Sequence, residues 1–186
     1  MIKFLGLLSK KKKIRAIDLA PIYVAAIENV VSKGFLEMSD FINKNNNFER
    51  SPGLTKSDID WFRNVVFLAN ISNLSSFFEE DEVTILRAFI LEYRYKDISI
   101  NEQNLSMETF LEYEKYFNDL ISKHENLFKS MSFAIFEKYF LNDFQGSLFR
   151  KKNKPNPVFI NELKNLLQHF IWNWSEYLQK NKVIFK

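Results

Sequence analysis

Apolar residues recur every three or four positions through most of this chain, and that spacing limits its fold more than any other feature. The most regular stretch lies near the C-terminus, where one stripe holds Leu163, Leu167, Phe170, Trp174 and Leu178. Such a stripe is typical of an amphipathic helix that buries one face. Only four glycines and four prolines occur in 186 residues, so few positions interrupt the pattern. We therefore predict an all-α, single-domain bundle of about six or seven helices.

Capping residues and helix breakers predict where the first helices begin and end. We expect Asp18 to cap a helix that ends at Gly34, with a second, shorter helix following it. Ser57 and Asp60 have the spacing of a capping box, which predicts a helix from there to about Leu74. That segment is apolar on more than one side, so it should lie at the centre of the fold.

The second half of the chain follows the same rules. Glu79 to Glu82 place acids at the start of a helix, and residues 98–105 are expected to form a connector before a helix that begins at Ser106. Two more helices are predicted, from about 125 to 143 and along the C-terminal stripe, with a basic, proline-containing loop at 150–157 between them. The tail, residues 182–186, alternates like a strand, and we expect it to pair with residues 2–5.

Residues 1–15 form a basic N-terminal segment ahead of the helical domain predicted for 16–186. Here apolar residues, among them Phe4 and Leu8, precede the basic run of Lys10, Lys11, Lys12 and Lys13. A secretory signal has the opposite order, with its charge ahead of the apolar stretch. No uninterrupted run of about 20 apolar residues is present, so we expect no membrane span and a cytoplasmic protein.

Residue types that are absent or scarce exclude several kinds of chemistry. The chain has no cysteine, which excludes disulfides, thiolate catalysis and Cys-based metal sites. Its glycines are too far apart for a phosphate-binding loop, because such loops need two or three glycines within a few residues. The two histidines match neither a zinc-protease motif nor the Glu-x-x-His pairs of di-iron proteins. We therefore predict no metal, no cofactor and no catalytic residues.

The two histidines, His124 and His169, are the groups that titrate near neutral pH without a shifted pKa. His169 lies beside the C-terminal apolar stripe, so we expect it to be packed or hydrogen-bonded in the fold. His124 lies at a predicted helix junction, where a capping or solvent-facing position is expected.

Charge is distributed unevenly along the chain, although the net charge is only +3. Residues 1–54 carry a net charge of +4, residues 55–149 carry −7, and residues 150–186 carry +6. The three segments could neutralise one another in the fold. Alternatively, the acidic helices could face a basic partner, since complementary potentials accelerate association.

Our leading hypothesis is a soluble, non-enzymatic protein that binds another protein. The candidate binding residues are acidic: Glu79, Glu80, Asp81, Glu82, Glu108 and Glu112. A helical body that lacks catalytic groups and carries acidic residues resembles bacterial immunity proteins and antitoxins. The resemblance lies in general character, since no motif carries it, and it implies a basic toxin as partner. We expect neither nucleic acid nor a small-molecule substrate to bind.

Two alternatives remain. The first is a peripheral membrane adaptor, in which Phe4 and Leu8 insert weakly into a bilayer and Lys10 to Lys13 contact anionic headgroups. The second is a helical hydrolase or nuclease, which requires one of the two histidines to lie in a cleft.

Overall fold

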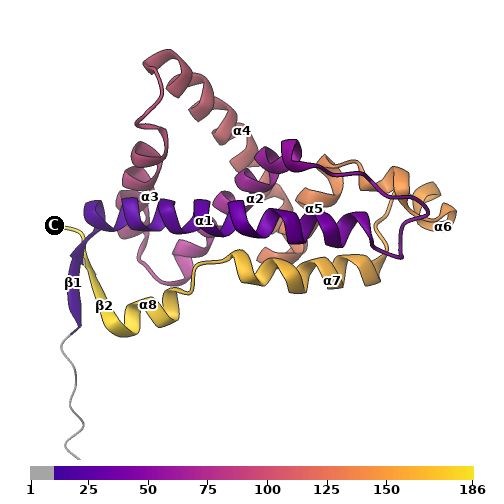
Figure 1. Cartoon of the computed structure of the whole chain (residues 1–186). Helices are drawn as coiled ribbons and strands as arrows, with labels where there is room; N and C mark the ends of the chain where they lie inside the picture. Colours follow the sequence, from indigo (N-terminus) through magenta and orange to yellow (C-terminus); the bar gives the residue numbers. More distant parts are fainter. Residues whose placement is uncertain (1–10) are drawn as a thin grey trace, which may run out of the picture.

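A long helix, α1 (Ala16–Asn43), runs the length of the molecule (Figure 1). The computed structural model describes residues 11–186, apart from the side chains of residues 100 and 104. The helices α2 (Ile59–Ser72), α5 (Leu127–Lys138) and α7 (Pro157–Leu167) build the body with α1, and α3 (Glu80–Tyr95) packs on α1. The others are α4 (Ile100–His124), α6 (Ser147–Lys151) and α8 (Trp174–Lys180), with four 3₁₀ turns between helices, η1 (Lys56–Asp58), η2 (Asn73–Ser76), η3 (Leu141–Phe144) and η4 (Gln168–Phe170). The predicted all-α bundle is confirmed.

The centre of the fold is α2, as its apolar residues on several sides predicted. Every residue from Val65 to Ile71 is buried, and α2 packs against α1, α4 and α5. A helix buried on all sides must satisfy any polar group it carries. Asn70 does so by donating to the carbonyl oxygens of Val66 (2.8 Å) and Phe170 (2.9 Å) and accepting from the Trp172 N–H (2.8 Å).

The first helix is longer than predicted, because Gly34 lies within α1 and does not end it. A Cβ atom at this position would lie 2.4 Å from Cε1 of Phe170 and 2.6 Å from its Cζ. The ring of Phe170 is buried and packs edge-on against Phe62, with 4.9 Å between the ring centres. Gly34 therefore makes room for a ring, a requirement that sequence spacing does not reveal. Asp18 lies in the first turn, paired with Arg15, and is not the cap.

Two helix starts differ from prediction for the same local reason. The capping box at the start of the α2 region is made by Thr55 and Asp58, whose carboxylate accepts from the Thr55 N–H at 2.7 Å, and not by Ser57 and Asp60. The helix predicted to start at Ser106 begins six residues earlier, since Ser99 and Glu102 form a capping box there. Both pairs have the spacing of the motif, so the sequence offered more candidates than the fold uses.

The prediction of a buried apolar stripe near the C-terminus is correct, but the stripe does not lie on one continuous helix. Leu163, Leu167, Phe170 and Trp174 are buried, yet the chain leaves α7 through η4 and re-enters a helix only at α8. The bonds from Asn70 to Phe170 and Trp172 hold this break against α2. The basic stretch at 150–157 is likewise part helix, since α6 includes Arg150 and Lys151 and Pro157 begins α7.

A short sheet joins the two ends of the described chain. The strand β1 (Lys12–Arg15) pairs in parallel with β2 (Asn181–Ile184), so that Ile14 lies opposite Val183. The tail does form a strand, as predicted. Its partner is residues 12–15, whereas the predicted partner, residues 2–5, lies outside the described residues.

Residues 80–124, which we call the α3–α4 arm, extend away from α1 (Figure 1). α3 packs on α1 and leads outward, and α4 returns from the tip to contact α2 and α5. Arg87 of α3 and Glu114 of α4 join the two helices through two hydrogen bonds of 2.6 and 3.2 Å. This paired, two-bond geometry connects the two helices of the arm.

By length and composition alone, α1 could cross a membrane, and the sequence analysis did not identify it as such a segment. In the fold it behaves as a core helix. Eleven of its residues are buried, and they face α2, α3 and the other elements that pack on it.

Candidate functional site

The acidic run at Glu79–Glu82 lies at the start of α3. Glu79, Glu80 and Asp81 are exposed, whereas Glu82 turns back so that its carboxylate accepts from the Glu79 N–H at 3.2 Å. Acids at this end of a helix are stabilised by the free N–H groups of the first turn. Part of this run therefore serves the helix, and its exposed part is available for binding.

Glu108 and Glu112 lie on the outward face of α4. Both are exposed, and helical spacing places them on one side with Leu105 and Asp119. Leu105 is 65% exposed and Leu111, at the edge of this face, is 46% exposed, both high values for leucine. The outward face of α4 thus combines acidic and apolar side chains with the exposed Lys115.

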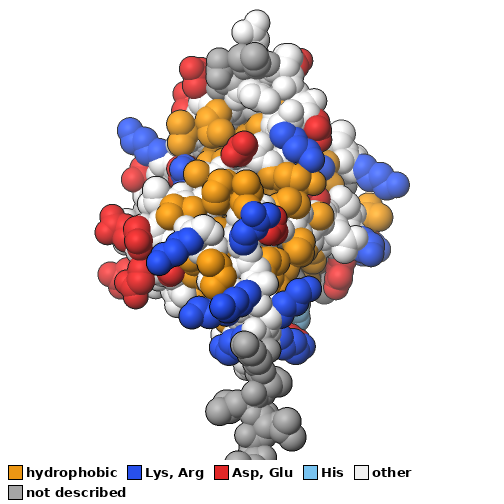
Figure 2. Space-filling model, turned by 90° about the vertical axis from the view of Figure 1, so that its left-hand side faces the viewer, with side chains coloured by type: hydrophobic (Ala, Val, Ile, Leu, Met, Phe, Trp, Pro, Cys, Tyr) orange, Lys and Arg blue, Asp and Glu red, His pale blue; other side chains and the backbone are white. Residues whose placement is uncertain are grey.

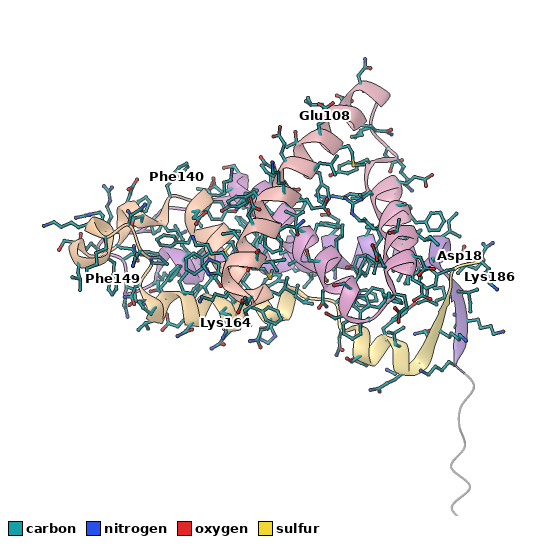
Figure 3. The ribbon with its side chains drawn as sticks, turned by 180° about the vertical axis from the view of Figure 1, so that it is seen from behind. Asp18, Glu108, Phe140, Phe149, Lys164 and Lys186 are labelled. Carbon is teal, nitrogen blue, oxygen red and sulfur yellow. The ribbon has the colours of Figure 1, made fainter. Side chains whose placement is uncertain are left out.

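The six predicted acidic residues fall into two groups. Figure 3 shows Glu108 near the far end of the α3–α4 arm, whereas α3 begins at the opposite end, beside the body. Their carboxylates form no ion pair with any side chain that the structure describes. The opposite charges of the three chain segments therefore do not neutralise these six positions by direct contact.

The basic N-terminal segment is described only from Lys11. Phe4, Leu8 and Lys10 lie outside the described residues, whereas Lys11, Lys12 and Lys13 are exposed at β1. Figure 2 shows this end of the molecule, where hydrophobic side chains gather with Lys and Arg side chains around them. Ile17, at the start of α1, contributes to the exposed apolar surface with half of its area accessible.

The histidines take positions that differ from those predicted. His169 is exposed on η4 and is not packed into the fold. His124, the last residue of α4, is half-buried, and its ring stacks on Phe133 with 3.9 Å between the ring centres. Its Nε2 atom is buried without a hydrogen-bond partner among the described residues.

His124 lines a cavity of about 720 Å³ between α5 and the loop before α7. The walls combine the lysines Lys123, Lys129 and Lys154 with apolar groups such as Phe136. Burial, followed by the charges of Lys129 and Lys123, lowers the pKa of His124, which favours the neutral ring near pH 7. His124 thus lies in a cavity, as the hydrolase alternative requires. A neutral imidazole there could accept a proton.

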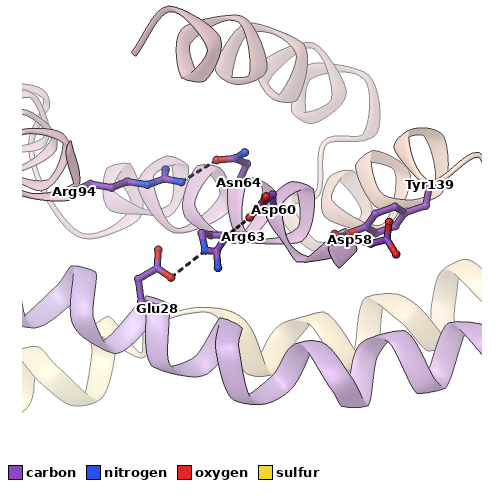
Figure 4. A network of polar contacts seen from close by, with 7 residues as sticks. All are labelled: Glu28, Asp58, Asp60, Arg63, Asn64, Arg94 and Tyr139. Atoms are coloured by element: carbon purple, nitrogen blue, oxygen red, sulfur yellow. Dashed lines mark hydrogen bonds and ion pairs between the residues drawn. The ribbon is translucent and has the colours of Figure 1, made fainter. Parts of the chain in front are cut away.

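A polar network links α1, α2 and α3 beneath the arm (Figure 4). Arg63 of α2 pairs with Glu28 of α1 at 3.0 Å and with Asp60 one turn earlier. Arg94, near the end of α3, donates to Oδ1 of Asn64 at 2.8 Å. Farther along, the Tyr139 hydroxyl donates to the Asp58 carbonyl at 2.5 Å. Asp60, Arg63, Asn64 and Arg94 of this network line a second cavity, of about 670 Å³, between α2, α3 and α4.

The guanidinium of Arg94 is surrounded by aromatic rings. Its central carbon lies 4.0 Å from the centre of the Phe67 ring, 5.2 Å from that of Phe110 and 5.3 Å from that of Tyr95. Burial lowers the pKa of Arg94, although an arginine so placed still carries its charge at neutral pH. Its Nη1 atom is buried with no hydrogen-bond partner among the described residues.

Sequence analysis missed Arg94, although its spacing offers a signal. Leu86 and Ile90 are buried on α3, and Arg94 follows at the same four-residue interval. An arginine on the inward stripe of an amphipathic helix must find partners inside the fold. The residues that receive it, Asn64, Phe67 and Phe110, come from other helices, and no sequence rule connects them to Arg94.

The described residues contain no group of three or more His, Asp or Glu side chains placed to hold a metal ion. Comparison of the chain with family models, with curated proteins and with solved structures finds no match.

Proposed function

We propose that this chain is a soluble, non-enzymatic protein that binds a basic partner protein through the outward face of α4. The observation that carries the proposal is the arm itself. α4 extends away from the body and presents Glu108 and Glu112, without ion-pair partners among the described side chains, next to exposed leucines. Exposed leucines and unpaired carboxylates contribute little to the stability of the fold.

The composition of this face matches what protein interfaces use. An apolar centre supplies contact area, and charges around it set orientation and speed of encounter. Leu105 and Leu111 supply the apolar part, and the carboxylates supply a negative potential that attracts a basic protein. An inhibitor of the immunity or antitoxin kind, which blocks a basic toxin, would use such a face.

The product of the neighbouring gene is the first partner to test, with binding measured by calorimetry at two salt concentrations. We expect tight binding that weakens as salt rises, and weaker binding by the variant Glu108→Lys/Glu112→Lys. The matched control is Glu37→Lys/Asp143→Lys, which makes the same charge change at exposed positions outside the arm. Equal loss of binding in both variants would reject the α4 face as the site.

The membrane alternative has its own support in the face shown in Figure 2. Exposed lysines at 11–13 and the nearby apolar side chains would suit an anionic bilayer surface. Flotation with anionic vesicles tests it, using the full chain and the variant Lys11→Glu/Lys12→Glu/Lys13→Glu. Equal recovery of the two proteins with the vesicles, or no recovery of either, would exclude it.

The hydrolase alternative now depends on His124, which lines a cavity, whereas His169 is exposed on η4. His124→Gln keeps a polar side chain and removes the base. Unchanged activity of that variant in any hydrolytic assay that the wild type passes would exclude His124 as a catalytic residue.

A further inference from the structure

Arg94, in the cavity beneath the arm, makes no direct ion pair with a described residue, although the charge of nearby Glu28 acts to raise its pKa. Seven described ion pairs occur in the chain, and Arg94 takes part in none of them. Its neutral partner Asn64 occupies one nitrogen, and aromatic rings surround the guanidinium. A charge withdrawn from water in this way costs free energy unless an anion compensates it.

The other charged residues of the cavity are already balanced. Arg63 contacts the carboxylates of Glu28 and Asp60, so it offers little positive charge to a ligand. Asp60 also lines the cavity and would repel an anion, a dianion about twice as strongly as a monoanion. The cavity is therefore suited to a single negative charge placed against Arg94.

The remaining walls combine apolar side chains with the hydroxyls of Ser106 and Thr109. Tyr95, Ile98, Leu105, Phe110 and Tyr113 line the cavity, and its volume of about 670 Å³ is within the range of small-molecule sites. Inorganic phosphate or sulfate would leave the apolar walls without contact. An organic molecule that carries one carboxylate would contact both the apolar walls and Arg94, since a guanidinium donates charged hydrogen bonds to a carboxylate.

We propose that the cavity between α2, α3 and α4 binds an organic monocarboxylate, with the carboxylate on Arg94 and Asn64 and the hydrocarbon body against the α4 side chains. The site goes beyond the proposed protein-binding function, although the two share Leu105, which lies at the rim of the cavity and on the edge of the outward face of α4. Glu108 and Glu112 are not among the residues that line the cavity.

The probe is 4-phenylbutyrate, titrated into the full chain and followed by the amide NMR signals of residues around the cavity. We expect saturable binding with one ligand per chain and shifts centred on Asn64, Tyr95 and Phe110. The neutral analogue 4-phenylbutanamide should bind on the order of tenfold more weakly, since it loses the charged hydrogen bonds. Inorganic phosphate should not compete.

Two variants test the role of Arg94. Arg94→Met keeps the length of the side chain and should weaken phenylbutyrate binding on the order of tenfold or more. Lys96→Met is the matched control, because it removes the same charge from an exposed position two residues away, outside the cavity lining. Binding by the control should equal that of the wild type.

A third variant distinguishes a loss of binding from a loss of folding in Arg94→Met. Thr109→Glu places a carboxylate on the cavity wall at a half-buried position of α4 and should also weaken binding. The proposal is overturned if phenylbutyrate does not bind saturably, if the amide or phosphate binds as tightly, or if both cavity variants bind as the wild type does.

Discussion

Replacing Gly34 with alanine tests the packing that keeps α1 a single helix. In an open helix the change would stabilise the protein by about 1 kcal/mol, because alanine loses less backbone freedom and favours helices. Here the added Cβ would lie 2.4 Å from Cε1 of Phe170, about 1 Å closer than an ordinary carbon contact. The ring cannot withdraw freely, because it packs against Phe62. Overpacking of this kind costs about 1–3 kcal/mol.

We expect Gly34→Ala to lower the free energy of unfolding by about 1–2 kcal/mol, which corresponds to a decrease in Tm of roughly 2–8 °C. In a Phe170→Leu background the ring is absent, and the same change should be neutral or stabilising by up to about 1 kcal/mol. The coupling energy between the two positions should then be about 1–3 kcal/mol.

Urea denaturation of the four proteins of this cycle, with Ser32→Ala as an exposed control on α1, gives these energies. A gain of about 1 kcal/mol for Gly34→Ala in the wild-type background would refute the reasoning. It would mean that no ring occupies the space beside Gly34 and that the assignment of this glycine to packing is wrong.

Three further predictions concern polar groups. Asn70→Leu should lower the free energy of unfolding by about 2–4 kcal/mol in urea denaturation, since the Trp172 N–H and the Phe170 carbonyl lose their partner inside the fold; a loss below about 1 kcal/mol would contradict the role given to this side chain. Arg87→Met should lower the free energy of unfolding by about 1–2 kcal/mol. The double variant Arg87→Met/Glu114→Met should lose the same amount or less, because it leaves no unpaired half-buried carboxylate. A much larger loss for the double variant in the same assay would argue against the pair. For His124, the lowered folded-state pKa means that the unfolded chain binds its proton more readily, so stability should fall as the pH falls below about 6.5. His124→Gln should make the difference in urea midpoint between pH 7.5 and pH 5 smaller, and an unchanged difference would show that His124 does not contribute.

Local sequence rules predicted the elements that depend on residues close together in the chain. The apolar stripe placed Leu163, Leu167, Phe170 and Trp174 in the core, and the apolar character of residues 59–71 placed α2 at the centre. The alternation of the tail predicted β2. These follow because periodicity reports which face of a segment is buried, whatever covers it.

The errors occur where a partner distant in sequence decides the outcome. The prediction that Gly34 ends a helix is wrong because the ring that packs against this glycine belongs to Phe170, 136 positions later in the chain. The prediction of one continuous C-terminal helix is wrong because the break between α7 and α8 is stabilised by Asn70, about 100 positions earlier.

The candidate site shows the same division. The acidic residues of α4 could be named from the sequence, and their exposure follows from helical spacing. The direction of the arm could not be predicted from the sequence, since it depends on contacts of α3 with α1 and on the Arg87–Glu114 pair. The cavity at Arg94 brings together three helices that no local pattern connects.

The central claim is that a basic protein binds the outward face of α4, and photo-crosslinking from that face tests it most directly. A photoreactive phenylalanine analogue at Leu111 should crosslink to a single basic protein in the cells from which the gene comes. The same analogue at Val158, an apolar residue of α7 that is 55% exposed, should not. The account predicts that the Leu111 crosslink disappears in the Glu108→Lys/Glu112→Lys variant. A crosslink that persists in this variant, or one that forms equally from Val158, would contradict it.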